Sequence, residues 1–512
     1  MTNSFFLRSA FAWSLSLLVG MLLLFLPSAK GASGTWNLSG NGVWSGSTNW
    51  LGNVIADGAG STGDFSTFNI LANTVVTMDT TSRTLGTLTI GDPTGNQQYT
   101  IDASGGATLT MNNSGSGALI SRTQAGTTTI SVPIILADDL TIRKEGTNAF
   151  NINGGITSIG GTRNLVLENN TNQALNFGSS STLNHVGSIT NIGSGGGATS
   201  ISASIGANVT EIIQNSASST MSLGTGNSAF IGSVSVQNGT LSTGNNSLNV
   251  NNLVTMSANG IFENNASSGL TIAGLSGAGG IVQGGNTTNL RSLTLGGSGT
   301  SSYSGVIADK DFAGGGFTSI TKSGLGTQIL SGTNTYTGAT TVTAGTLIIE
   351  GSLGNTVVSV TGGILGGSGT IGGSVTVSTG TLAPGSSPGT LTVNDDLTMD
   401  SGSTYLFEAG DLTNVTGQLD LNNTWTLSLA PSANWQVGGT TVLFEYGTLA
   451  ASPWLTPAIV DNTGLGGILT VTDNGSQIIL NGYSVVPEPA AVLMAGLGLT
   501  LVLLRRRLQL RS

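Results

Sequence analysis

Residues 322–354 read KSGLGTQILSGTNTYTGATTVTAGTLIIEGSLG, and this stretch decides the fold. It contains three short runs of β-branched and apolar residues, TQIL, ATTV and TLII, and a glycine-bearing turn follows each run. Alternation of apolar residues with Thr over about four residues is the pattern of a half-buried strand. The stretch therefore predicts a chain that turns a corner after every short strand.

Short runs of the same kind recur along the chain. The tripeptide Gly-Thr-Leu begins at residues 86, 239, 345, 380, 389 and 447, more often than composition alone would give. Between the two ends we find no convincing helical stripe of apolar residues. Coils of short strands cannot bury their apolar side chains alone, so we expect one coil to stack on the next. Further runs are TLGTLTIGD (84–92), ATLTMNN (107–113), TTTISVPIIL (127–136) and NLVLEN (164–169).

Five elements of residues 322–354 keep a defined order and spacing. They are Lys322-Ser323-Gly324, Leu330-Ser331-Gly332, Asn334-Thr335-Tyr336-Thr337-Gly338, Thr340-Thr341-Val342 and Gly345-Thr346-Leu347. In these elements the stretch closely resembles the autotransporter-associated β-strand repeat. A fainter copy, LTLGGSGTSSYSGVIADK, lies at 293–310. The resemblance and the repeated strands imply an all-β fold, a right-handed parallel β-helix (β-solenoid).

The repeat also sets an expected scale. If each coil has roughly 20 residues, the chain would form on the order of 20 coils, with about 4.8 Å between neighbouring coils. Asn and Thr at equivalent corners are expected to form hydrogen-bonded ladders between coils, as in NNSLNVNNL at 245–253.

The N-terminus has the layout of a secretory signal peptide. Arg8 gives a short positive start, residues 10–26 are apolar, Pro27 ends that run, and Ala29-Lys30-Gly31 offers small residues for cleavage. The alternative is a retained membrane anchor. Export is predicted in either case.

The C-terminus, VVPEPAAVLMAGLGLTLVLLRRRLQLRS, combines three features in order. A Pro-Glu-Pro segment precedes an apolar stretch at 490–504 that predicts a short helix, and an arginine cluster follows, which would stay in the cytoplasm. These features resemble the PEP-CTERM sorting signal, which implies transient membrane anchoring and recognition by an exosortase-type membrane peptidase. The alternative is an ordinary tail anchor. The matching residues are Val486, Pro487, Glu488 and Pro489 for the motif, and Arg505, Arg506 and Arg507 for the membrane stop.

Together these features divide the chain into six segments. They are a signal peptide (1–31), a Trp-rich N-terminal cap (32–70), β-helix repeats (71–321), the autotransporter-associated repeat with its following coils (322–400), C-terminal coils with a capping hairpin (401–484) and the sorting signal with its helix (485–512).

The open ends of a parallel stack need covers, because unpaired strand edges invite association. At the start, Trp36, Trp44 and Trp50 cluster in GTWNLSGNGVWSGSTNW, and we expect them to form an aromatic lid over the first coil. Carbohydrate stacking on the indole faces is the alternative. At the far end, Asp473-Asn474-Gly475 between two apolar runs predicts a capping β-hairpin.

The charge distribution limits the possible partners. The net charge is −10, and between Ser323 and Val486 the sequence has ten Asp and Glu but no Lys or Arg. Such a surface repels phosphate backbones, so we expect no nucleic-acid partner. The chain has no Cys, which excludes a disulfide scaffold, thiolate metal sites and a Cys nucleophile.

Catalytic groups are sparse. A glycosidase needs two carboxylates at a defined separation, but adjacent residues of a strand point to opposite faces. A lyase would also need cations to hold a uronate, and Arg143-Lys144 is the main candidate pair. We expect the Asp and Asn residues beside Gly to be turn formers. The candidate carboxylates are Asp138-Asp139, Asp395-Asp396 and Asp400.

Metal and cofactor sites are not predicted either. His185 is the only histidine of the chain, so we expect a loop or corner residue rather than a ligand. Calcium could bind Asp-rich corners such as Asp57 to Asp64, but the nonapeptide array of calcium-binding β-helices is missing.

The sequence therefore predicts an exported structural or adhesive protein of the cell surface, extracellular matrix or biofilm, not an enzyme and without a cofactor. Its expected partners are the exosortase-type peptidase and exopolysaccharide. The alternative is a polysaccharide-active β-helix enzyme of the cell surface, a lyase or a glycosidase.

Overall fold

The computed structural model describes residues 31–485 apart from residues 96, 286–288, 311–317, 387, 433 and 451–453. The chain divides into two compact units, one ending at Ala203 and the other beginning at Ser204. Strands build both units, and the described residues include no α-helix. Two 3-10 turns, η2 (Ser47–Asn49) and η3 (Leu51–Asn53), lie near the start.

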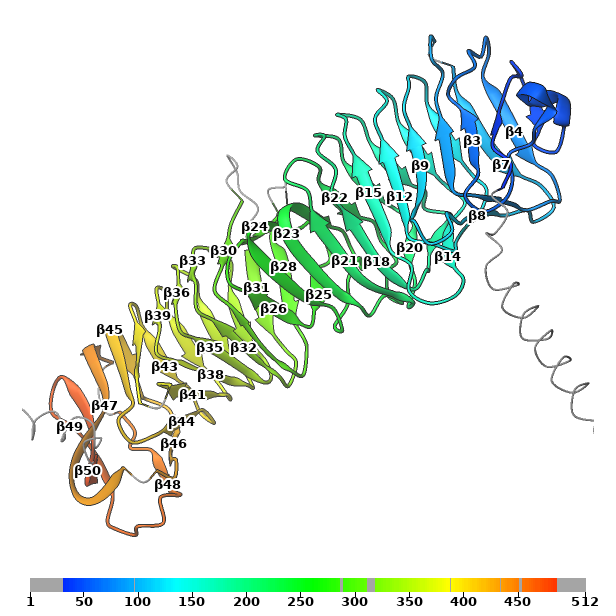
Figure 1. Cartoon of the computed structure of the whole chain (residues 1–512). Coiled ribbons are helices and arrows are strands. Elements are labelled where there is room, and N and C mark those ends of the chain that lie inside the picture. The colour runs from blue at the N-terminus through cyan, green and yellow to red at the C-terminus, as the bar shows by residue number, and fades with distance from the viewer. Residues whose placement is uncertain are drawn as a thin grey trace, which may run out of the picture. The chain divides into compact units, whose positions relative to one another are not determined.

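Unit 1 consists of coils with three strand-bearing faces (Figure 1). On each face, every strand pairs in parallel with the strands of the neighbouring coils. The first face holds β1 (Gly34–Thr35), β3 (Thr62–Phe65), β6 (Thr87–Ile90), β9 (Ala118–Arg122), β12 (Leu140–Lys144), β15 (Leu165–Asn169) and β18 (Gly187–Asn191). The second holds β2 (Gly42–Val43), β4 (Thr74–Met78), β7 (Tyr99–Ala103), β10 (Thr128–Ile130), β13 (Phe150–Ile152), β16 (Leu175–Phe177) and β19 (Thr199–Ile201). The third holds β5 (Arg83–Leu85), β8 (Leu109–Met111), β11 (Ile134–Leu136), β14 (Ile156–Ser158) and β17 (Thr182–Leu183).

Unit 2 also has three faces, which we name A, B and C (Figure 1). It begins with β20 (Ser204–Ile205). Face A holds β21 (Val209–Asn215), β23 (Ser233–Thr243), β24 (Leu253–Asn264), β26 (Gly274–Gly277), β29 (Thr300–Tyr303), β32 (Thr327–Leu330), β35 (Thr346–Ile349), β38 (Ile364–Gly367), β41 (Thr381–Pro384), β44 (Thr404–Phe407), β46 (Thr426–Leu429) and β48 (Ala458–Asp461).

Faces B and C share the long strand β45 (Leu412–Asp420). Face B also holds the second halves of β23 and β24, and β22 (Met221–Leu223), β27 (Ile281–Gly284), β30 (Val306–Ala308), β33 (Thr333–Asn334), β36 (Ser352–Leu353), β39 (Thr370–Ile371), β42 (Thr390–Val393), β47 (Trp435–Leu449) and β50 (Gln477–Val485). Face C also holds β25 (Leu270–Ile272), β28 (Arg291–Leu295), β31 (Thr318–Lys322), β34 (Thr340–Val342), β37 (Val358–Val360), β40 (Val375–Val377) and β43 (Leu397–Met399).

Side chains alternate between the interior and the surface along the strands. From Leu140 to Lys144, β12 runs buried, half-buried, buried, half-buried, buried. Inward residues of stacked strands lie in register, because Leu140 pairs with Ala118 of one neighbouring coil and Leu165 of the other. Each coil thus covers the apolar side chains of the next, which is how short strands obtain a common core.

The predicted all-β parallel solenoid is confirmed, with about 16 turns rather than 20. In the quoted repeat, Thr327 pairs with Thr346 and Thr346 pairs with Ile364, so these coils have 19 and 18 residues. In unit 1, Leu140 pairs with Leu165, 25 residues further on. Longer corner loops in unit 1 therefore reduce the number of turns.

The three N-terminal tryptophans form a buried cluster. Trp36, Trp44 and Trp50 are at most 1% exposed and surround the ring of Phe65, with ring centroids 5.1 to 5.5 Å from it. Their indole N–H groups donate to the backbone oxygens of Leu38, Ala56 and Trp44, respectively. The burial agrees with the predicted aromatic lid. It leaves no indole face for a sugar, so the carbohydrate-stacking alternative does not fit this structure.

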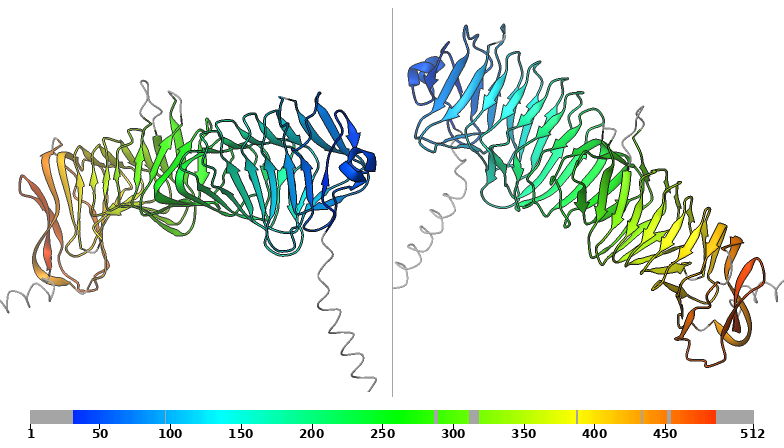
Figure 2. Two further views of the ribbon diagram at one scale, coloured as in Figure 1. Left: turned by 45° about the horizontal axis from the view of Figure 1, so that its top comes forward. Right: turned by 180° about the vertical axis from the view of Figure 1, so that it is seen from behind.

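At the far end, unit 2 finishes with antiparallel strands. The strand β49 (Thr470–Asp473) pairs with β50 in an antiparallel hairpin, as the Asp473-Asn474-Gly475 signal predicts. β50 also pairs antiparallel with β47, which itself pairs in parallel with β45. Figure 2 shows these strands in orange and red at the end of unit 2. The hairpin thus covers the edge of β47.

Long donor side chains occupy interior corners. Arg122 and Lys144 end the stacked strands β9 and β12, pair in register and are fully buried. Arg122 donates to the carbonyl of Gly126, and Lys144 donates to the carbonyl of Gly146. In unit 2, Lys322 is buried in the same way and donates to the carbonyl of Gly324. These cations cap corner carbonyl groups that would otherwise lack a partner.

The characteristic residues of the repeat also join neighbouring coils. Tyr336 is buried, and its hydroxyl lies 2.7 Å from that of Thr340. Thr340 lies 3.3 Å from Thr356, which donates to the carbonyl of Gly338 at 2.6 Å. The predicted ladders in residues 245–253 are present as well, since Asn245 donates to Ser267, 22 residues further on.

Candidate functional site

The first pair of candidate carboxylates holds corner loops together. The Asp138 carboxylate accepts from the backbone N–H groups of Asn113 and Gly115, at 2.6 and 3.0 Å. The Asp139 carboxylate accepts from the N–H of Asn164 at 2.9 Å. The two side chains thus bind loops of the coil before and the coil after. They do not converge on a common space.

The second group behaves similarly. Asp396 accepts from the N–H of Gln418 at 2.7 Å, and Asp400 accepts from the side chain of Asn423 at 3.2 Å. Asp395 is exposed. These contacts agree with the predicted turn-forming role.

The cations considered for a uronate lie on different sides of their strand. Arg143 points outward and forms an ion pair with Glu168. Lys144 points inward, and burial together with the charge of Arg122 lowers its pKa to about 8. Arg143 and Lys144 therefore do not form a joint anion site.

The remaining candidates also form local contacts. His185 is buried, its Nε2 lies 3.1 Å from the backbone oxygen of Ser188, and burial lowers its pKa. Asp57 binds Arg83 at 3.0 Å, and Asp64 accepts from the N–H of Ser66 at 2.8 Å. In the described part of the chain, no cluster of three or more His, Cys, Asp or Glu side chains is suited to hold a metal ion.

One carboxylate pair was not predicted from the sequence. Asp411 is 5% exposed and lines a hollow of about 290 Å³ together with Glu408. Burial raises the pKa of Asp411 to about 6, although its carboxylate accepts from the N–H groups of Gly389 and Glu408, at 3.1 and 3.3 Å. Gly385 packs so close that a Cβ atom there would lie 1.9 Å from Asp411. The two glycines at positions 385 and 389 were the sequence signal for this site.

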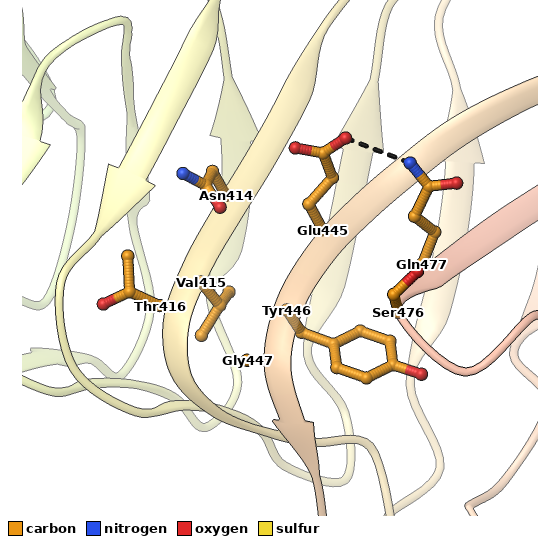
Figure 3. A pocket seen from close by; sticks show the side chains of 8 residues that line it. All are labelled: Asn414, Val415, Thr416, Glu445, Tyr446, Gly447, Ser476 and Gln477. Carbon is orange, nitrogen blue, oxygen red and sulfur yellow. Dashed lines mark hydrogen bonds between the residues drawn. The ribbon is translucent and has the colours of Figure 1, made fainter.

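A second hollow, of about 380 Å³, lies on face B next to the hairpin (Figure 3). Glu445 and Gln477, on adjacent strands, are joined by a hydrogen bond of 3.0 Å, and Asn414 pairs with Glu445 on the other side. The ring of Tyr446 borders the same space. The hollow therefore combines amide, carboxylate and aromatic groups.

Tyr446 is held in place by the hairpin. Its hydroxyl donates to Asp473 of β49, and its backbone N–H donates to Ser476 at 3.2 Å. Burial, followed by the hydrogen bond and the negative charge of Asp473, raises its pKa to about 12. The ring is thus a neutral, fixed wall at physiological pH.

An outward row of polar side chains on face B ends at this hollow. In register on successive strands, each residue pairs with the next along the row. We call this row the face B ladder, and it consists of Thr333, Ser352, Thr370, Thr392, Asn414, Glu445 and Gln477.

Sequence reasoning found the hydroxyl-rich strands but not this register. The paired positions are separated by 19, 18, 22, 22, 31 and 32 residues, and a varying separation produces no fixed sequence period. The structure was needed to align them.

The predicted sorting residues lie outside the described residues, as do the predicted signal peptide through residue 30 and the Arg505 to Arg507 stop. The described segments contain no helix with the length and apolar character that a bilayer crossing requires.

A comparison with known families identifies part of the repeat region. Residues 320–349, from β31 into β35, match the family model of the passenger-associated transport repeat. No curated protein matches the chain. The match supports the repeat identified from the sequence, and together with the β-solenoid it fits an autotransporter-like surface passenger.

Proposed function

We propose that the protein is an exported structural or adhesive component of the cell surface or extracellular matrix and is not an enzyme. The observation that carries the proposal is the passenger-associated repeat within a parallel β-solenoid. The hydrogen bonds of Asp138, Asp139 and Asp396 to neighbouring coils support the same conclusion, because they assign these carboxylates a structural role.

The proposed route uses both ends of the chain. A signal peptide directs export, and the Val486 to Pro489 motif is recognised by an exosortase-type membrane peptidase after transient anchoring in the inner membrane. The arginines at 505–507 support this orientation, because basic residues stay on the cytoplasmic side. The released body then stays at the surface, with exopolysaccharide as its partner.

A polysaccharide-active enzyme is the second candidate, and one observation favours it. Asp411 has a raised pKa and shares a hollow with Glu408. A general acid of a glycosidase needs such a carboxyl group beside a second carboxylate. Asp411, however, accepts from the backbone N–H groups of Gly389 and Glu408 and thereby holds the chain at Gly389.

Two measurements on the exported protein test the proposal. Protease treatment of intact cells should remove it, because the body lies outside. Incubation with neutral and acidic glycans should release no reducing ends and no unsaturated products. Glycan cleavage that is lost in Asp411→Asn, with Asp396→Asn as the matched control, would establish the enzyme instead.

A further inference from the structure

We propose that the face B ladder is a binding track for a neutral linear polysaccharide, which crosses the strands and ends in the hollow at Glu445. The proposal rests on the proposed surface function and names the ligand class and the residues. It begins from the register, since seven polar side chains on adjacent strands form one row.

The ladder offers hydrogen-bonding groups at a regular spacing. Neighbouring strands lie about 4.8 Å apart, so one polar side chain follows the next at that distance. Thr333 is exposed, and Ser352, Thr370 and Thr392 are half-buried. Within the described residues, the hydroxyls of these four side chains make no hydrogen bond to the protein. They are therefore available to a ligand with many hydroxyl groups.

The surface beside the ladder is low at three of its strands. The residues that follow Leu353, Ile371 and Tyr446 in the chain are glycines, at positions 354, 372 and 447. These three positions carry no side chain that would keep a polymer away from the ladder. A polysaccharide that crosses the strands can therefore approach the ladder closely at these positions.

Charge selects a neutral polymer. The stretch from Ser323 to Val486, which holds the ladder, contains ten Asp and Glu residues and no Lys or Arg. A polyuronate or sulfated glycan would meet repulsion and no compensating cation. A neutral glycan needs only hydrogen bonds, which the ladder supplies.

The hollow gives the track an end. Glu445 and Gln477 fix each other by their hydrogen bond of 3.0 Å, and Asn414 lies beside them. The Tyr446 ring, held by Asp473, forms a wall against which a sugar ring can pack. Convergent polar groups beside an aromatic ring are typical of a small-molecule site.

The other two faces of unit 2 are less suitable. On face A, Ile329 and Ile348 follow two residues after the outward threonines of β32 and β35, so an apolar row accompanies that ladder. On face C, the row of Thr341, Ser359, Thr376 and Thr398 leads to the carboxyl group of Asp420. Face C nevertheless provides a control surface of the same chemistry.

Affinity electrophoresis of the full chain tests the proposal. The gels contain hydroxyethylcellulose, dextran or mannan as neutral probes, and alginate as the polyanion. The test variant combines Ser352→Ala, Thr370→Val and Thr392→Val on face B. The control variant combines Thr341→Val, Thr376→Val and Thr398→Val on face C, at positions with the same burial.

We expect at least one neutral probe to retard the protein and alginate to have no effect. Loss of three hydrogen bonds should weaken binding by about tenfold or more in the face B variant and leave the face C variant unchanged. Circular dichroism confirms that both variants are folded.

Three results would overturn the inference: no retardation by any neutral probe, retardation by alginate alone, or equal loss in both variants. Surface exposure of the protein on intact cells would persist in each case. If only the binding proposal is wrong, the protein is still accessible to protease on intact cells. If the proposed surface function is wrong, the protein is inaccessible on intact cells.

Discussion

At the scale of single residues, Asn334 shows how one side chain joins three coils of unit 2. Its carbonyl oxygen accepts from the N–H of Ile307 at 2.9 Å, and its amide donates to Ser352 of the next coil at 3.1 Å. The same amide donates to Gly332 at 3.2 Å. Asn334 is 1% exposed, so water cannot take over the hydrogen bonds that its side chain makes to these backbone groups.

Replacing Asn334 by Leu should therefore lower the free energy of unfolding by about 3 kcal/mol, since buried backbone groups would lose their partner. Asn355→Leu is the control, because Asn355 is an exposed asparagine of the next coil. Urea unfolding followed by circular dichroism measures both. Equal midpoints for the two variants would show that the Asn334 contacts do not stabilise the coil.

Lys144 gives a prediction about pH. Its pKa is about 8 in the folded protein, below the ordinary value of 10.5, so between these values the unfolded chain binds more protons. The free energy of unfolding should then rise as pH increases from about 8 towards 10, because deprotonation removes the cost of burying the charge. Lys144→Met should reduce this rise, and the part that remains belongs to Lys322, whose pKa burial also lowers.

The matching measurement compares urea midpoints at about pH 7.5 and about pH 9.5, below the range in which most tyrosines of the unfolded chain ionise. Lys310→Met serves as control, because Lys310 lies in an ion pair with Glu263. A rise of undiminished size in Lys144→Met would contradict the assignment.

At the scale of elements, the two covers differ in construction. The N-terminal cover is a cluster of aromatic rings around Phe65, and the C-terminal cover is the hairpin of β49 and β50. Both solve the problem of unpaired strands at the end of a stack.

The hairpin can be loosened by a buried charge. Ile478 of β50 is fully buried against the sheet, and Ile478→Asp should free β47. We expect faster hydrogen exchange in β47 and concentration-dependent self-association through the open edge, while Thr470→Asp, at an exposed position, should change neither. A protein that stays monomeric with unchanged exchange would argue against the capping role.

The same elements explain what sequence could predict. The alternation of apolar and polar residues in TQIL and TLII reflects burial on one side of a strand, and the glycines that follow these runs mark turns. Both signals are local in sequence, so the strands and the solenoid could be predicted. The glycine of Gly-Thr-Leu at Gly345 has φ +65°, and a Cβ there would lie 2.1 Å from the oxygen of Gly324, which accounts for that tripeptide in the repeat. The burial of the Lys144 side chain could not be predicted from the sequence, because lysines normally lie at the surface.

The Glu408 and Asp411 hollow and the face B ladder escaped prediction for a different reason. Both depend on which residues of separate coils become neighbours, and the separation of paired positions varies from Thr333 to Gln477. The strands can be predicted from the sequence, but the register between strands of separate coils cannot.

At the scale of the whole chain, the net charge of −10 and the absence of cations from Ser323 to Val486 make one further prediction. If the ladder binds a neutral polymer, its affinity should be insensitive to salt between about 0.05 and about 0.5 M, because no ion pairs are screened. Affinity electrophoresis at the two salt concentrations measures this. A strong decrease in retardation at high salt would indicate an ionic ligand.

In the proposed function, the chain is exported, processed at both ends and delivered to the cell surface as a solenoid. Mass spectrometry of both termini, on protein released from the surface of intact cells, tests it most directly. We expect a mature chain that begins near Gly31 and lacks the residues after about Pro489. Recovery of an intact Arg505 to Ser512 peptide from that surface fraction would contradict it.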